Sequence, residues 1–359
     1  MFTSQKYFIL LYSIFFAVTL FFAILINNLL LKFSKTLGIR DKELLQARWA
    51  STTKPSIGGV SFYICFLLSI IAYPYFIDTK ILLCNFQFLG IIWAATLAFI
   101  MGLFDDAFNT NVWVKLFSQI GCTIILIVTG TIIKIFNSDY LNYLITIIWV
   151  VGMMNSINML DNMDAITTII AIPIILTIII TLMIFSGMDN PYLFALIGLL
   201  STLIGFLFFN WHPAKMYMGD TGSQFLGFIL AFIGITFFWN FKTETGITTI
   251  AQKFISVALA FALPLIDTTT VFIKRINKGK SPFIGGRDHT THHLFYVGLS
   301  EKQIALLYGI ITIIYSFLSI TVLYFIPVWY FIHAIVFSLF FILLFVILFY
   351  IANKNINKE

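Results

Sequence analysis

The sequence has very little charge for its length. Only 36 of its 359 residues are charged, 15 acidic and 21 basic, whereas roughly 25% of the residues in soluble domains are charged. Apolar residues make up 60% of the chain, and so few polar side chains cannot cover a water-soluble surface. The composition excludes a soluble enzyme, a secreted disulfide scaffold and a disordered protein. It predicts an all-α, polytopic integral membrane protein.

Cysteine is also scarce. The three cysteines, Cys65, Cys84 and Cys122, lie far apart and form no C-x-x-C pair, which argues against both a metal site and a disulfide framework. The net charge of +6 comes from basic residues spread over short loops, so we expect no nucleic-acid partner. No internal repeat is visible, which disfavours a transporter built from inverted repeats.

Long apolar stretches dominate the chain. A membrane-spanning helix needs roughly 20 such residues, and we count about eleven spans, or ten if the short fifth stretch is not one. The stretches lie near residues 8–33, 58–77, 86–104, 113–136, 142–157, 165–186, 191–210, 222–241, 248–275, 304–326 and 328–351. We expect the first to be a retained span, because its apolar run is about twice the length of a signal-peptide core. No long polar insertion separates the stretches, so we expect a single transmembrane domain over residues 1–359.

The basic residues predict an orientation. Of the 21 lysines and arginines, 16 lie in or beside the loops that follow odd-numbered stretches. The other five are Lys6, Lys80, Lys134, Lys242 and Lys253. Because cytoplasmic loops carry the excess of Lys and Arg, we expect the N-terminus outside and the C-terminus in the cytoplasm. The predicted cytoplasmic loops lie near residues 34–57, 105–112, 158–164, 211–221 and 276–303.

The polar motifs also lie in or beside the loops that follow odd-numbered apolar stretches. Five clusters fall at or beside the predicted cytoplasmic ends, at residues 48–59, 105–115, 155–164, 210–223 and 279–294. The outer loops carry little beyond isolated charges. We therefore predict one composite site at the inner membrane surface.

Five aspartates fall in three of these clusters. Asp105 and Asp106 are adjacent at the end of an apolar stretch. Asp161 and Asp164 would share a face if their segment were helical, and Asp220 lies in a Met-Gly-Asp-Thr-Gly-Ser turn. Carboxylates gathered at one face need a cation or protons to offset their repulsion, and oxygen ligands suit Mg²⁺ or Mn²⁺. A single aspartate is explained equally well as a solvated helix cap or as a functional group, but five aspartates in converging loops predict a metal site.

Two motifs suggest phosphate binding. The turn at residues 218–223 precedes a predicted helix, whose N-terminal N–H groups favour phosphate, although a plain N-cap by Thr221 or Ser223 is the alternative. The run Gly-Arg-Asp-His-Thr-Thr-His-His gathers Arg287, His289, His292 and His293. Guanidinium and imidazole groups suit phosphate oxygens, whereas a zinc site would lack a nearby Cys or Glu.

Four further polar residues have competing interpretations. Lys115 could reach a phosphate beside the aspartate pair or simply extend to the membrane interface. Asp267 lies within an apolar stretch and is a functional candidate, but a salt link to Lys115 or to another loop base is equally consistent. His333 is best explained as a partnered core residue, and His212 is undecided.

Together and in this order, the clusters resemble those of the polyprenyl-phosphate N-acetylhexosamine-1-phosphate transferases, glycosyltransferase family 4. The resemblance runs from residue 54 to residue 294, most of the chain. The S-P-F-x-x-x-R-x-H form at 281–289 and Asp267 look like the GlcNAc-1-phosphate transferases that initiate surface polysaccharides. The P-x-H-H-H-x-E form typical of phospho-MurNAc-pentapeptide transferases is absent, and that group is the alternative.

The resemblance implies a reaction at the cytoplasmic face of the inner membrane. A UDP-N-acetylhexosamine would donate its sugar 1-phosphate to undecaprenyl phosphate, and UMP would leave, with Mg²⁺ or Mn²⁺ as cofactor. The chain would then be a single catalytic domain, and a homodimer is left open.

The resemblance also implies roles for individual residues. The implied metal ligands are Asp220, Asp161 and Asp105, and the implied catalytic residues are Asp105, Asp106, Asp220 and His289. The implied nucleotide-sugar contacts are Asn158, Asp161, Asp164, Asn210, Tyr217, Arg48 and Lys54. The implied phosphate contacts are Lys115, Arg287, His289, His292 and His293.

The sequence departs from the family pattern in two places. Asn162 and Ala165 replace the glycines of the usual D-G-x-D-G segment, and a left-handed backbone at Ala165 would be strained. The histidines read His-x-x-His-His, with a spacing that the family does not usually show.

Two other classes remain as alternatives. An intramembrane prenyltransferase also uses aspartate-rich motifs and Mg²⁺, but Asp105-Asp106 lacks the further Asp of D-D-x-x-D, and the Arg-His loop has no role there. A cation-coupled transporter needs charges along a path through the bilayer, for which only Asp267 is a clear candidate.

Overall fold

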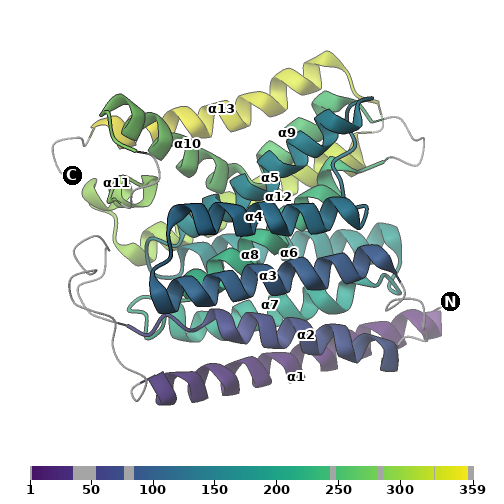
Figure 1. The fold of residues 1–359 in the computed structure, drawn as a ribbon. Helices are drawn as coiled ribbons and strands as arrows, with labels where there is room; N and C mark the ends of the chain where they lie inside the picture. The colour runs from purple at the N-terminus through teal and green to yellow at the C-terminus, as the bar shows by residue number, and fades with distance from the viewer. Residues whose placement is uncertain are drawn as a thin grey trace. The chain divides into compact units, whose positions relative to one another are not determined.

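The computed structural model describes residues 2–34, 54–76, 85–242, 248–281, 286–326 and 328–354. Within these ranges the chain is helical, without a β-strand and with one isolated bridge between Ser56 and Tyr217, so the predicted all-α fold is confirmed. The helices in Figure 1 are α1 (Phe2–Ser34), α2 (Gly59–Phe76), α3 (Phe86–Phe108), α4 (Val112–Val128), α5 (Asp139–Leu160), α6 (Ile166–Thr181), α7 (Tyr192–Asn210), α8 (Gly219–Ile233), α9 (Ile250–Ala260), α10 (Ala262–Asn277), α11 (Thr290–Tyr296), α12 (Glu301–Ile320) and α13 (Phe331–Lys354). Three π-helical turns continue α6, α8 and α12, namely η2 (Leu182–Ser186), η3 (Gly234–Trp239) and η4 (Thr321–Phe325).

Most of these helices suit a membrane. Among the described residues, nine helices are long and apolar enough to cross one, and the bent pair α9 and α10 would make ten. Helix α4 is apolar but has only 17 residues. Each predicted apolar stretch overlaps a helix or the bent pair, but the fourth, predicted over residues 113–136, is helical only to Val128. The fifth stretch is longer than predicted, because α5 begins at Asp139 and accommodates Asn142, whose Oδ1 accepts from the Phe136 N–H at 3.0 Å.

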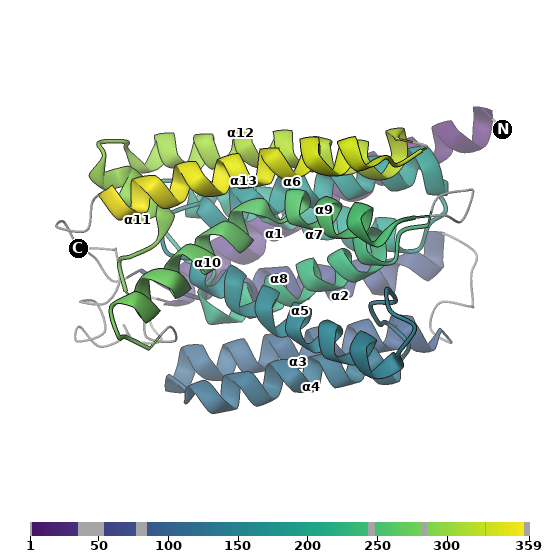
Figure 2. The same ribbon diagram turned by 90° about the horizontal axis from the view of Figure 1, so that it is seen from above.

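The helices fall into two compact units. The first contains α1 to α4, α7 and the beginning of α8. In it, α1 and α2 lie against α7, and α3 runs beside α4 (Figures 1 and 2). A Cβ at Gly198 of α7 would collide with Ser69 Oγ of α2, and one at Gly205 would lie 3.1 Å from Ala23 Cβ of α1. Small residues thus let these helices approach closely, as is common between membrane helices.

The second unit contains α5 and α9 to α13. Here α9 packs against α12, and α10 packs against α5. Ser156 Oγ of α5 donates to Pro264 O of α10 at 2.7 Å. Tyr315 OH of α12 donates to Phe340 O of α13 at 2.7 Å. Hydrocarbon offers no hydrogen-bond partner, so pairing buried polar groups within the protein avoids a large cost.

A sharp bend separates α9 from α10. The two helix axes differ by 83°, and Phe261 between them has φ −110°. Pro264 follows in the first turn of α10, and its ring has no N–H to donate to a carbonyl one turn earlier. The single apolar stretch predicted over residues 248–275 is therefore broken near its middle.

Candidate active site

The end of α3 places Asp105 in a buried position of the first unit, where polar groups surround its carboxylate. Asn109 adopts a left-handed conformation, φ 50°, and its N–H donates to Asp105 O, so the helix stops there and the chain turns back. The turn brings both the N–H and the hydroxyl of Thr110 to Asp105 Oδ1, at 2.8 and 2.6 Å. Oδ2 forms an ion pair with Lys115 Nζ at 2.5 Å. Lys115 is thereby directed to the aspartate pair.

Asp106 holds a different element. Its Oδ2 accepts hydrogen bonds from Thr221 N at 2.8 Å and Thr221 Oγ1 at 2.7 Å. Thr221 is in the first turn of α8, so a carboxylate from the end of α3 caps the helix that begins in the Met-Gly-Asp-Thr-Gly-Ser turn. Because a carboxylate near a helix N-terminus is stabilising, this contact fixes α8 against α3.

Glycines make this close approach possible. Gly219 has φ +72°, and a Cβ there would collide with Ser56 O and Asp106 Oδ2. A Cβ at Gly102 of α3 would collide with the backbone of Asp220, and one at Gly59 would collide with Gly222. The two glycine-rich motifs at residues 54–59 and 218–223 are thus packed backbone against backbone.

Asp220 completes a carboxylate cluster in the first unit. The carboxyl groups of Asp105 and Asp220 are hydrogen-bond neighbours, and the charges of Asp106 and Lys115 act on Asp220 at short range. Three aspartates with one lysine leave an excess of negative charge, which a cation or a proton must offset. The donors are carboxylate oxygens, which Mg²⁺ and Mn²⁺ prefer, so the residues fit the predicted cofactor.

The segment before α2 pairs with the segment before α8. Gly58 N donates to Tyr217 O at 3.0 Å, and Tyr217 N donates to Pro55 O at 2.8 Å. Lys54 Nζ lies 5.3 Å from the centre of the Tyr217 ring, within the range of a cation–π contact. Asn210 is buried and its Nδ2 donates to Met216 O at 3.1 Å. Arg48 lies outside the described residues.

The Asn-x-x-Asp-x-x-Asp segment belongs to the second unit. Helix α5 ends at Leu160, so Asp161 and Asp164 lie in a turn rather than on one helix face. Asn158 is in the last turn of α5 and is half-buried. Ala165 has φ +66°, so the backbone has the left-handed conformation that glycine would adopt without strain.

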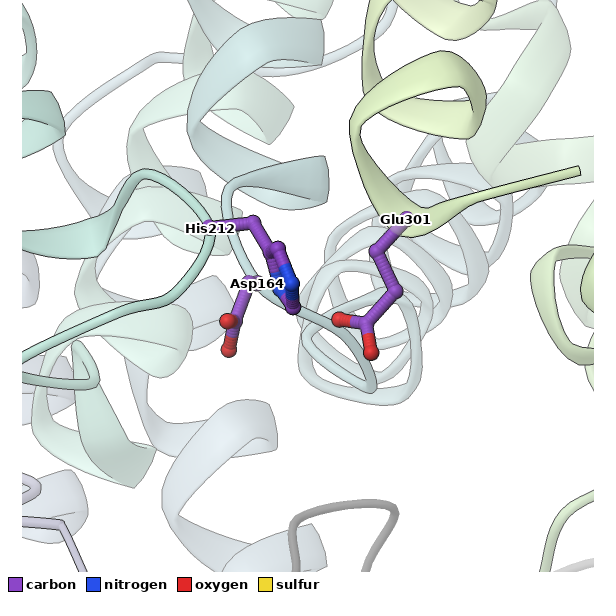
Figure 3. Close-up of side chains that lie close together, drawn as sticks. All are labelled: Asp164, His212 and Glu301. Carbon is purple, nitrogen blue, oxygen red and sulfur yellow. The ribbon is translucent and has the colours of Figure 1, made fainter.

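Two side chains of this turn, Asn162 and Asp164, lie close to other elements of the second unit. Asn162 Oδ1 accepts from Thr291 Oγ1 at 2.7 Å, which links the turn to the histidine-containing segment. Asp164 and Glu301 have carboxylate oxygens within 4.8 Å of each other (Figure 3, which also labels His212 of the first unit). Glu301 is the first residue of α12, whose Ser300 and Gln303 form a capping box. A proton or a cation would offset the repulsion of this carboxylate pair.

His289 is held from one side by a buried carboxylate. Its Nδ1 lies 2.8 Å from Asp267 Oδ2, and both groups are buried. Asp267 Oδ1 accepts from Thr290 N at 2.8 Å and from Thr290 Oγ1 at 2.6 Å. The sequence left open a salt link from Asp267 to Lys115 or to another loop base. The structure has the second, with His289 as the base, whereas Lys115 pairs with Asp105.

The neighbours of His289 differ in environment. Arg287 is exposed. Asp288 forms a two-pronged ion pair with Arg275, at 2.7 Å for both contacts. Burial would raise the pKa of Asp288, but the hydrogen bonds and charge of Arg275 outweigh it and hold this pKa below its usual value.

The last two histidines of the run are buried in α11. Burial, and next the charge of His289, lower the pKa of His292 to about 3, so its ring is neutral near pH 7. His293 Nε2 lies 2.5 Å from Lys274 Nζ. A lysine ammonium can only donate, so this nitrogen of His293 is the acceptor.

The candidate residues therefore form two groups. Those of the first unit are Lys54, Asp105, Asp106, Lys115, Asn210, Tyr217 and Asp220. Those of the second are Asn158, Asp161, Asp164, Arg287, His289, His292 and His293. Residues that sequence reasoning missed are the donors Thr110 and Thr290, the Arg275–Asp288 pair and Glu301. No sequence pattern marks the hydroxyls of Thr110 and Thr290 as donors. The Arg275–Asp288 pair has a signal in the sequence, because charged residues are few in this chain.

Comparison with known proteins indicates a family. Residues 88–238 match the model of glycosyl transferase family 4, a region that contains both aspartate motifs of the first unit and the turn at residues 158–165. The histidine-containing segment lies outside the matched region.

Named relatives agree with this match. A probable undecaprenyl-phosphate N-acetylglucosaminyl 1-phosphate transferase of Bacillus subtilis is 27% identical over 278 residues, covering 74% of this chain and 72% of the relative. An undecaprenyl-phosphate alpha-N-acetylglucosaminyl 1-phosphate transferase of Escherichia coli K12 is 25% identical over 322 residues, 83% of this chain and 81% of the relative. A phospho-N-acetylmuramoyl-pentapeptide-transferase of Endomicrobium trichonymphae is 32% identical over 140 residues, 38% of this chain and 34% of the relative.

Proposed function

We propose, from the match of residues 88–238 to glycosyl transferase family 4, that the chain transfers an N-acetylhexosamine 1-phosphate from a UDP-sugar to undecaprenyl phosphate. The names of the relatives that align over most of the chain favour GlcNAc 1-phosphate. The observation that carries the proposal is the cluster of Asp105, Asp106 and Asp220 around Lys115. Such a cluster suits phosphate groups accompanied by a divalent cation.

The reaction is a phosphoryl transfer between anions. An oxygen of the lipid phosphate forms a bond to the phosphorus that carries the sugar. The bond from that phosphorus to the bridging oxygen breaks, and UMP leaves with that oxygen. The lipid phosphate is already an oxyanion near neutral pH, so positioning and charge neutralisation provide most of the catalysis.

Mg²⁺ or Mn²⁺ would be held by Asp220 and Asp105, and Asp161 stays a predicted ligand. Bound there, the cation would neutralise phosphate charge and polarise phosphoryl oxygens. The chain's own residues position it: Thr110 and Lys115 orient Asp105, and Asp106 anchors the first turn of α8, in which Asp220 lies.

The remaining candidates would bind the substrates. Lys115 and Arg287 carry charges suited to phosphate, with His289, His292 and His293 as predicted further contacts. Tyr217 offers an aromatic ring for the uracil, while Lys54, Asn158, Asp164 and Asn210 are predicted to contact the nucleotide-sugar. Arg48 shares that prediction.

The site would face the cytoplasm from the inner membrane. The excess of lysine and arginine after odd-numbered stretches supports a cytoplasmic C-terminus and an external N-terminus, with eleven spans if α4 and the bent pair each cross. UDP-sugars are cytoplasmic metabolites, so this orientation is required by the proposed reaction.

A donor scan tests the proposal. Purified protein in detergent is incubated with undecaprenyl phosphate, Mg²⁺ and one UDP-sugar at a time, and UMP and the lipid product are quantified. We expect UMP and a lipid-linked diphospho-sugar with UDP-GlcNAc. UMP only with UDP-MurNAc-pentapeptide would instead establish the alternative supported by the Endomicrobium relative, and no UMP with any donor would refute both.

A further inference from the structure

We propose that Asp267 is a positioning residue that acts on the substrates through His289, by fixing which ring nitrogen carries the proton and where the ring points. The inference rests on the proposed function for its catalytic consequence. Its structural part concerns only the four residues Asp267, His289, Thr290 and Tyr308, all of the second unit.

Three donors converge on the Asp267 carboxylate. Oδ1 accepts the N–H and the hydroxyl of Thr290, and Oδ2 faces His289 Nδ1. Asp267 is 1% exposed and lies in the interior of α10. A carboxylate so placed is costly unless it is fully hydrogen-bonded, and these contacts supply one bond to Oδ2 and two to Oδ1.

The proton positions follow from the chemistry of these groups. An ionised carboxylate can only accept, so His289 Nδ1 must carry a proton. The single hydroxyl proton of Thr290 is also directed to Asp267, at 2.6 Å. Tyr308 OH lies 2.7 Å from the same Thr290 oxygen, so Tyr308 is the donor in that pair. The result is one ordered network from Tyr308 through Thr290 to Asp267 and His289.

The network sets the lone pair of His289. With Nδ1 protonated and bound to Asp267, the neutral ring has its lone pair on Nε2, the ring nitrogen that does not face Asp267. The ring can then accept a hydrogen bond or a proton at Nε2. The same logic of an orienting carboxylate operates in other acid–base sites.

Helix α10 also fixes the segment on both sides of His289. Arg275 holds Asp288 before it, and Lys274 contacts His293 after it. Lys274 follows Asp267 by seven residues, about two helical turns, so the two lie on one face of α10. The backbone of the histidine segment is therefore secured separately from the ring, and Asp267 is not needed merely to keep the segment in place.

Substitution of Asp267 by Asn should reverse the tautomer. The amide oxygen of Asn can take the two Thr290 donors, and its NH₂ then faces His289 Nδ1. That nitrogen must become the acceptor, and the proton moves to Nε2. The variant keeps its size and polarity, so the change falls on the direction of one hydrogen bond.

The direct test is a ¹⁵N-histidine NMR spectrum of the full-length protein in detergent at about pH 9, well above the usual histidine pKa. His289→Gln identifies the signals of His289 among the five histidines. We expect a protonated Nδ1 in the wild type and a protonated Nε2 in Asp267→Asn. The matched control is Asp288→Asn, which alters a neighbouring carboxylate paired with Arg275 and should leave Nδ1 protonated. A wild-type ring protonated at Nε2 overturns the proposal, and that spectrum needs no variant of Asp267 to fold.

Kinetics test the catalytic consequence. We expect Asp267→Asn to lower kcat for UMP release by about 10- to 100-fold with little change in KM for UDP-GlcNAc, and Asp267→Glu to recover part of the loss. Because Asp267 acts through His289, Asp267→Asn should cost little further activity in a His289→Gln background. Full, additive losses in the double variant would mean a purely structural role. If the wild type releases no UMP from any donor, the proposed function fails, while the NMR result still decides the proton position.

Discussion

Asp105 and Asp106 adjoin in the sequence, yet each carboxylate holds a different part of the first unit. Each accepts the N–H and the hydroxyl of one threonine, Thr110 for Asp105 and Thr221 for Asp106. The motif was predicted from scarce charge at the end of an apolar stretch. The threonines could not be predicted, because hydroxyl residues are common and only the folded backbone shows which one a carboxylate meets.

Ala165 shows a local conflict at the scale of one residue. It adopts φ +66°, a left-handed conformation whose strain costs an alanine roughly 1–2 kcal/mol. A glycine avoids this strain, but part of the gain is lost because the unfolded chain has more conformational freedom with glycine than with alanine. We therefore expect Ala165→Gly to stabilise the protein by about 1 kcal/mol. The measurement is the thermal midpoint in detergent, which should rise while UMP release is retained.

The control for this prediction is Ala171→Gly. Ala171 is buried within α6, where glycine costs roughly 1 kcal/mol relative to alanine, so its thermal midpoint should fall. A fall for Ala165→Gly as well would contradict the interpretation that the alanine is strained.

His292 predicts a dependence of stability on pH. Its pKa is lowered from 6.5 to about 3 in the folded chain, so between these values the unfolded chain binds the proton and the folded chain does not. Stability therefore rises with pH across that window and falls on acidification, by about 1.4 kcal/mol per pH unit from this group. Thermal midpoints at pH 7 and pH 5 should differ more in the wild type than in His292→Gln. Equal acid sensitivity of the two proteins would argue against a buried, neutral His292.

At the scale of helices, hydrophobic length predicted most of the fold. The apolar stretches were located correctly, because spanning a membrane imposes a minimum run of apolar residues. Their ends and breaks were less predictable. α5 begins earlier than expected because Asn142 is satisfied by the backbone of Phe136, and the bend before Pro264 depends on packing that hydropathy does not describe.

The approach of α3 to α8 depends on glycine, which can be tested with a matched pair. Gly219 and Gly279 have similar positive φ angles, +72° and +65°, but a Cβ at Gly219 would meet Ser56 O and Asp106 Oδ2, whereas one at Gly279 would meet nothing within 4 Å. Gly279→Ala should therefore cost only the conformational strain, roughly 1–2 kcal/mol. Gly219→Ala should destabilise more and should also reduce UMP release.

The two variants are compared by thermal midpoint and by UMP release in the same detergent. Equal effects of Gly219→Ala and Gly279→Ala on both quantities would show that contact between the two glycine-rich motifs is unimportant.

At the scale of the whole molecule, the sequence predicted the protein class and the membrane face of the site, but not the division of the chain into two compact units. Parity of the loops placed the five aspartates on one predicted side, since each span reverses the side of the chain. Parity cannot say which loops belong to one compact unit. Asp105, Asp106 and Asp220 fall in the first unit, and the turn with Asp161 falls in the second, together with the histidine segment. That division arises from helix packing across distant parts of the chain.

We propose that the Asp105–Asp106–Asp220 cluster carries phosphoryl transfer. The most direct test is UMP release from UDP-GlcNAc and undecaprenyl phosphate by purified Asp220→Asn, compared with Asp139→Asn as a control. Asp139 is an exposed carboxylate in the first turn of α5, so its loss changes the net charge equally without touching the cluster.

We predict that Asp220→Asn keeps the wild-type thermal midpoint within about 2 °C, the shift expected for roughly 1 kcal/mol or less. Its UMP release should fall at least about 100-fold, in the range seen when a stabilising electrostatic group is removed, and Asp139→Asn should match the wild type. Full UMP release by a folded Asp220→Asn protein would contradict the account.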